Sequence, residues 1–159
     1  MDICRRMRKR MRVLYQICFS PTGSTKRVAD ILCRAWEDHW TEVDLSKKLE
    51  QEAPVECPSG ELCLVAVPSF AGRVPEIAAR RIRHINGNGP RAVLVCVYGN
   101  RAYDDTLLEL QDLLTGCGFQ PVAAIAAVAE HSIIRSFGAG RPDEADRLEL
   151  ERFAGKIAR

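Results

Sequence analysis

A run of hydroxyl-bearing residues follows the first apolar stretch of the chain. Residues 13–19 are largely apolar and lead into Ser20-Pro-Thr-Gly-Ser-Thr25, directly before a helical pattern. A strand that turns into a helix presents free backbone N–H groups and the positive end of the helix dipole, which together attract anions. Gly23 lets the backbone approach an anion closely, and the hydroxyls add donors without adding charge. The loop therefore predicts a phosphate site formed by Ser20, Thr22, Gly23, Ser24 and Thr25.

The type of phosphate site is narrowed by what the loop lacks. A Walker loop needs Gly-Lys-Ser/Thr, but here Lys26 follows Ser24 and Thr25. A dinucleotide loop needs three spaced glycines, and this loop has one. A loop of hydroxyls without a cation suits a phosphate monoester that is held and not transferred. The same residues would also suit an ordinary strand–helix turn in which Ser24 or Thr25 caps the helix.

The elements that position this loop alternate between strand and helix. Continuous apolar runs indicate strands, and amphipathic patterns indicate helices between them. Because the apolar runs lack polar–apolar alternation, they are typical of a parallel sheet covered on both faces. We therefore predict an α/β fold with a five-stranded parallel sheet and helices on both faces. The expected strands are 13–19, 41–45, 62–67, 92–98 and 121–129, and the expected helices are 24–40, 74–85, 104–114 and 143–158.

Ligands of parallel sheets lie at the carboxyl ends of the strands, so the loops that follow the strands are the candidate site. The loop at 68–75 carries Phe70, which could lie against a flat ring or pack into the core, and Gly72, which permits close backbone approach. The loop at 99–105 begins with Gly99-Asn100, and its Tyr103 could stack on a ring.

Two further features of these loops have alternative interpretations. Asp104 or Asp105 could cap the helix that follows the third loop. His131 is the histidine placed at a strand's carboxyl end, where it could face a ligand or be structural.

Taken together, these loops resemble those of the flavodoxin family. The resemblance runs from about Met11 to Ile157, and its motifs at 20–25, 68–75, 98–105 and 129–133 are most similar to the flavodoxin module of ferredoxin-fused bacterial and archaeal flavoproteins. It implies a three-layer flavodoxin-like sandwich with strand order 2-1-3-4-5 and the cofactor FMN. The implied cofactor-binding residues are Ser20, Thr22, Gly23, Ser24, Thr25, Ser69, Phe70, Ala71, Gly72, Arg73, Gly99, Asn100, Arg101, Tyr103, Asp104 and His131.

The function that the resemblance implies is electron transfer as an FMN protein, with a ferredoxin or another redox protein as partner. Two alternatives stay open: an NAD(P)H-dependent FMN or quinone reductase of the same fold, and a non-catalytic module that binds FMN or another phosphorylated ligand. The chain departs from the family pattern in two respects. It carries no cysteine-rich ferredoxin segment, and its body is only mildly acidic.

Charge and length divide the chain into two expected parts. Its 159 residues suffice for one ordinary domain, which we place at 12–159. Residues 1–11 form a basic extension, expected to be disordered, and a start at Met11 would begin directly with the first strand. The net charge is +2, and residues 1–12 hold six Arg or Lys against one acid, so the remainder carries about −3. A nucleic-acid role would rest on this basic segment alone, and we do not expect one.

The seven cysteines include no Cys-x-x-Cys pair, and several lie within apolar runs. This pattern favours free thiols in a reducing cytoplasm over disulfides, a zinc site or an iron–sulfur cluster. The spacing of His39 and His84 suggests no metal site, so no metal is expected. No apolar run approaches the length of a membrane span, and no membrane partner is expected.

Overall fold

The computed structural model describes residues 14–47, 54–99, 102–131, 136 and 138–157. The predicted basic extension at 1–11 lies outside these residues, as do Asn100 and Arg101 of the candidate site.

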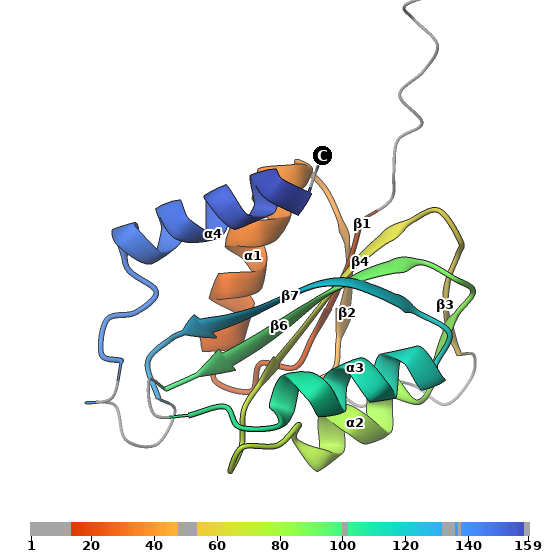
Figure 1. The fold of residues 1–159 in the computed structure, drawn as a ribbon, viewed down its shortest axis with the longest axis horizontal. Coiled ribbons are helices and arrows are strands. Elements are labelled where there is room, and N and C mark those ends of the chain that lie inside the picture. The colour runs from red at the N-terminus through yellow and green to blue at the C-terminus, as the bar shows by residue number, and fades with distance from the viewer. Residues whose placement is uncertain (1–13, 48–53, 100–101, 132–135, 137, 158–159) are drawn as a thin grey trace, which may run out of the picture.

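A parallel sheet of five strands forms the middle of the molecule (Figure 1). Its spatial order is β2-β1-β4-β6-β7, and every neighbouring pair is parallel. The inner strands are almost wholly buried, in keeping with their continuous apolar sequences. The strands are β1 (Leu14–Cys18), β2 (Thr41–Asp44), β4 (Leu62–Pro68), β6 (Arg91–Tyr98) and β7 (Gln120–Val128).

Two short strands were missed by the sequence prediction. β3 (Val55–Cys57) and β5 (Ile85–Gly87) pair with each other in a separate two-stranded parallel sheet. The described residues therefore form seven strands. The order predicted as 2-1-3-4-5 becomes 2-1-4-6-7 once β3 and β5 are numbered. Three-residue strands carry too few side chains to show a period, and β5 falls in a segment whose Asn and Gly residues favour a turn.

The described residues form four helices, which cover the two faces of the central sheet and make three layers (Figure 1). α1 and α4 share one apolar core with β1, β4 and β6, and their buried residues include Leu32 and Leu150. α2 and α3 share the opposite core, which includes Ile82 and Leu110. The helices are α1 (Ser24–Trp36), α2 (Glu76–Ile82), α3 (Thr106–Gly116) and α4 (Glu144–Ile157).

Helix α1 is shorter than the sequence prediction, which extended it to residue 40. It ends at Trp36 because Glu37 is extended, with φ −146° and ψ 151°. The Trp36 indole Nε1 donates a hydrogen bond to the Ala154 carbonyl at 2.9 Å, which ties the end of α1 to α4. None of the helices in the described ranges is both long and apolar enough to cross a bilayer.

Candidate functional site

A cavity of about 230 Å³ lies at the carboxyl ends of the strands. All four loops singled out from the sequence contribute to its wall, because parallel strands deliver their ends to one edge of the sheet. It is partly open to solvent. Eight of the predicted site residues line it: Thr22, Ser24, Thr25, Ser69, Phe70, Ala71, Gly99 and His131.

The other predicted residues lie elsewhere or outside the description. Ser20, Gly23, Gly72, Arg73, Tyr103 and Asp104 are described but do not line the cavity. Asn100 and Arg101 lie outside the described residues. The six described residues that do not line the cavity belong to the same loops and help to position them.

The first loop forms the start of α1. Gly23 occupies the N-cap position in the left-handed region, with φ 92°, and no side chain caps the helix there. Ser24 and Thr25 are therefore not caps, contrary to the simple turn interpretation. Their backbone amides precede the first intrahelical bond, from Arg27 N to Gly23 O, so the helix itself supplies neither with an acceptor.

Ser20 takes part in two hydrogen bonds that hold the first loop in place. Its Oγ accepts a hydrogen bond from the Lys26 amide at 3.0 Å, and its own amide donates to Ser46 Oγ at 2.8 Å. Ser20 therefore links the start of α1 to the turn that follows β2. It also borders a separate hollow of about 60 Å³. Thr22, Ser24 and Thr25 are the hydroxyl-bearing residues of this loop that line the main cavity.

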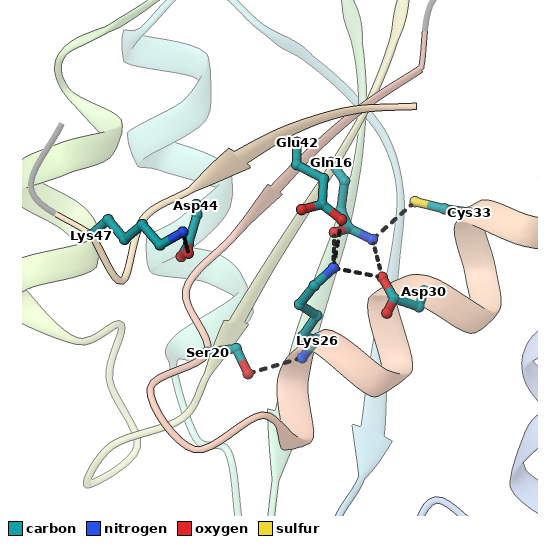
Figure 2. Close-up of polar contacts among 8 residues, drawn as sticks. All are labelled: Gln16, Ser20, Lys26, Asp30, Cys33, Glu42, Asp44 and Lys47. Atoms are coloured by element: carbon teal, nitrogen blue, oxygen red, sulfur yellow. Dashed lines mark hydrogen bonds and ion pairs between the residues drawn. The ribbon is translucent and has the colours of Figure 1, made fainter. Parts of the chain in front are cut away.

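The Lys26 ammonium bonds to side chains of α1, β1 and β2, as Figure 2 shows, and Lys26 is not among the residues that line the cavity. Its Nζ lies 2.9 Å from Asp30, 2.7 Å from Glu42 and 3.2 Å from the buried Gln16 side chain. Burial opposes the charged form, but the hydrogen bonds to Glu42 and Asp30 outweigh it and raise the pKa of Lys26. The first loop therefore offers neutral donors only.

The second loop makes a tight reversal between Phe70 and Arg73. The two residues exchange backbone hydrogen bonds of 2.9 and 3.0 Å, and Ala71 and Gly72 between them have φ of 51° and 73°. Ala71 is a non-glycine residue in the left-handed region, a strain that concentrates at binding sites. Phe70 stays 43% exposed beside the cavity, which rules out the alternative that it packs into the core.

The second loop is held in place by α3. Arg73 forms an ion pair with Glu109 at 2.8 Å, and the Val74 amide donates to the same carboxylate at 3.1 Å. The Arg73 hydrogen bond holds the pKa of Glu109 below its usual range. A Cβ on Gly72 would lie 2.4 Å from Asp104 Oδ2, so Gly72 is required for this close packing. Arg73, Gly72 and Asp104 therefore position the loop.

The third and fourth loops meet at Gly99. A Cβ at this position would lie 2.5 Å from His131 Cδ2, so the glycine makes room for the imidazole in the cavity wall. Tyr103 packs edge-on against Tyr98, with ring centroids 5.2 Å apart, and it is Tyr98 that lines the cavity. Asp105 is the N-cap residue of α3, and its side chain makes no capping hydrogen bond.

Six residues of the cavity wall are absent from the predicted site, and Glu130 is the charged one among them; the others are Pro21, Pro68, Val97, Tyr98 and Ala129. The Glu130 carbonyl accepts a hydrogen bond from Ser24 Oγ at 3.4 Å, and its carboxylate accepts one from the Gly140 amide at 3.2 Å. The described lining contains no Lys or Arg to offset the negative charge of this carboxylate. The place of Glu130 directly after a strand, next to His131, was the available signal.

The described thiols take no part in this cavity. Burial raises the pKa of Cys18, Cys33 and Cys96 to about 12, so these thiols stay protonated and unreactive at neutral pH. The described residues contain no group of three His, Cys, Asp or Glu side chains arranged to hold a metal ion.

Comparison with known proteins places the fold. No protein-family model and no curated sequence matches the chain. Among solved structures, it is similar to a flavodoxin of Streptococcus pneumoniae TIGR4, with TM-score 0.60, 21% identity and coverage of 92% of this chain and 98% of that one. Oxidised Flavodoxin 1 of Bacillus cereus gives TM-score 0.62 and 14% identity, over 91% and 96%. The azoreductase AzrA gives 0.56 and 10%, over 91% and 99%.

These likenesses span nearly the whole of each chain, and their low identities establish architecture only. The chain therefore has the α/β fold of flavodoxins and flavodoxin-like flavoproteins, with its cavity at the edge of the sheet where such folds bind ligands.

Proposed function

We propose that this chain binds FMN in the cavity at the carboxyl ends of the strands and serves as an electron-transfer flavoprotein. The observation that carries the proposal is that one cavity combines the Thr22–Thr25 hydroxyls with an exposed aromatic ring, Phe70. FMN has a phosphate monoester at one end and a flat ring system at the other. The resemblance of the loops and the shared fold support the same cofactor.

The residues present fit the two ends of FMN. Thr22, Ser24 and Thr25 would hold the phosphate through hydroxyl and amide donors at the start of α1. Phe70, Tyr98 and Gly99 would border the ring, and His131 would close the wall beside Gly99. The cavity of about 230 Å³ is below the roughly 300–1,000 Å³ of a fully enclosing site, so part of the ligand would stay accessible.

When bound, FMN supplies the capacity to accept and release one or two electrons. The chain's own residues bind and orient it and leave the cavity partly open to solvent. Phe70 lines the cavity and is 43% exposed, so a partner could approach the site at this ring. We propose a ferredoxin or another redox protein as that partner. The buried free thiols suit a reducing compartment, and we propose the cytoplasm.

The test is a titration of the purified full chain with FMN and with riboflavin, followed by flavin fluorescence and the visible spectrum. We expect saturation near one FMN per chain and at least about tenfold weaker binding of riboflavin, because riboflavin lacks the phosphate. The double variant Thr22→Val/Ser24→Ala should lose this preference. Thr115→Ala removes a hydroxyl that bonds within α3, and it should leave both affinities unchanged. Failure to bind FMN would remove the proposal.

A second candidate is an NAD(P)H-dependent reductase, which the likeness to an azoreductase favours. The FMN-loaded protein would then consume NAD(P)H in the presence of a quinone or azo dye. FMN binding without NAD(P)H consumption, but with electron exchange with a reduced ferredoxin, would favour the carrier. Binding with neither activity would indicate a non-catalytic module.

A further inference from the structure

The two edges of the central sheet differ in chemistry. The β2 edge is four residues long and carries Glu42 and Asp44, the kind of charge that blocks edge pairing. The β7 edge is nine residues long and contains no charged residue. In the described part of the chain β7 pairs with β6 alone, and it forms the near edge of the sheet in Figure 1.

The free hydrogen-bonding groups of β7 can be assigned by residue. Ala129 N donates to Tyr98 O of β6 at 3.0 Å, so from Ala123 onward, after the irregularity at the start of the strand, the odd-numbered residues of β7 direct their backbone groups to β6. Alternate residues of a strand point their backbone groups to opposite sides. Ala124, Ala126 and Val128 therefore direct their N–H and C=O groups outward, where a second extended strand could pair with them in register.

The sequence of this edge reads the same in both directions. Residues 122–128 are Val-Ala-Ala-Ile-Ala-Ala-Val, with Ile125 at the centre. An antiparallel pair about a two-fold axis at Ile125 would place Val opposite Val and Ala opposite Ala at every step. In this register Ala124 of one copy faces Ala126 of the other, and both have outward backbone groups, as a hydrogen-bonded antiparallel pair requires.

We propose that β7 is a homodimer interface, in which two copies join their sheets edge to edge through antiparallel pairing centred on Ile125. The occupant is a second copy because an uncharged strand does not repel itself and this one matches itself in side-chain size. Val122, 47% exposed, would be covered by Val128 of the second copy. The acidic β2 edge stops further addition, so the assembly closes at two.

One nine-residue strand gives a contact smaller than the standard interface of roughly 1,600 Å². The dimer should therefore form and dissociate with concentration. Sedimentation velocity of the full chain between about 1 µM and about 1 mM should show a monomer–dimer equilibrium without larger species. A monomer throughout this range, or an open series of larger species, would overturn the proposal.

Variants test the strand and its register. Ala124→Pro removes an outward N–H without breaking the β6 ladder, and it should weaken dimerisation at least about tenfold. The double variant A124E/A126E places four acids together and should be monomeric. A124K/A126E places each lysine opposite a glutamate and should restore the dimer.

The matched control is Leu108→Lys, which adds one charge at an exposed apolar site on α3 and should not change the dimer. Far-UV circular dichroism and thermal melting identify any variant that fails to fold. If Ala124→Pro fails to fold, the two double charge variants test the proposal instead. A dimer that survives in A124E/A126E, or that is lost in A124K/A126E as well, would overturn the pairing at Ile125.

Discussion

Glu130 sets the electrostatics of the cavity at the level of a single residue. It is the acidic residue of the described cavity lining, and its carboxylate would disfavour a bound phosphate because that lining contains no Lys or Arg to offset the charge. Replacing Glu130 with Gln keeps an oxygen that can accept from the Gly140 amide and removes the charge. We expect FMN to bind about fivefold more tightly to this variant, an effect of about 1 kcal/mol, and riboflavin to bind as before.

A fluorescence titration at low salt measures both affinities. Glu149→Gln is the control, because it removes the same charge from an exposed position on α4. Equal gains for FMN and riboflavin would contradict the phosphate explanation, and so would an equal gain from the α4 variant.

At the scale of elements, Lys26 joins α1, β1 and β2 through one ammonium group. Replacing it with Met would leave the buried Gln16 Oε1 and the Asp30 carboxylate without this donor. We expect the free energy of unfolding to fall by about 1–2 kcal/mol, since the cost of an unpaired buried acceptor is partly relieved by solvent near the exposed end of the network. Urea denaturation measures it.

The FMN affinity of Lys26→Met should stay within about twofold of the wild type, because the ammonium is bonded to Asp30 and Glu42 and Lys26 does not line the cavity. A large loss of FMN affinity at unchanged stability would mean that Lys26 turns toward the phosphate when the ligand binds.

An ion pair at the start of α4 should make the free energy of unfolding depend on pH in the acidic range. The Arg141 guanidinium bonds to Asp146, and this hydrogen bond is the main reason that the pKa of Asp146 is lowered to about 2. A carboxyl with a lowered pKa stabilises the fold above its unfolded pKa of about 3.9 and loses that contribution as the pH falls toward 2. Asp146→Asn should therefore cost about 1–2 kcal/mol at pH 6 and almost nothing near pH 2.

Urea titrations of wild type and Asp146→Asn across this range give the difference directly. Asp143→Asn is a useful comparison, because Asp143 lies just before α4 and its carboxylate accepts a hydrogen bond from the Asp146 amide. A difference for Asp146→Asn that does not shrink in acid would contradict the assignment to its ionised carboxyl.

The main elements could be predicted from the sequence because their signals are local and repeated. Apolar runs gave the five strands of the central sheet, and parallel pairing then brings residues as distant as Thr22, Phe70, Gly99 and His131 to one cavity. The features that could not be predicted are the pairing of short strands and the hydrogen-bond partner of an individual side chain. Ser20 bonds to the Lys26 amide, and nothing in the loop sequence distinguishes that acceptor role from a phosphate donor.

At the scale of the whole molecule, the cavity wall is built from loops that follow several different strands of the sheet. It includes the start of α1 and the ends of β4, β6 and β7, so global unfolding destroys it completely. A ligand that binds only the folded state raises its stability by RT ln(1 + [L]/Kd), which is about 2.7 kcal/mol at a hundredfold excess over Kd. For a domain of this size we expect saturating FMN to raise Tm by about 5–10 °C.

Differential scanning fluorimetry, read through tryptophan emission, measures this shift at several FMN concentrations. Riboflavin at the same concentrations should raise Tm less, because it gains nothing from the start of α1. Comparing the two ligands shows how much of the rise in Tm comes from contacts with the phosphate. If FMN binds tightly by fluorescence but leaves Tm unchanged, the ligand must leave through local opening of the loops before the sheet unfolds, and the cavity would then be a less stable unit than the core that carries it.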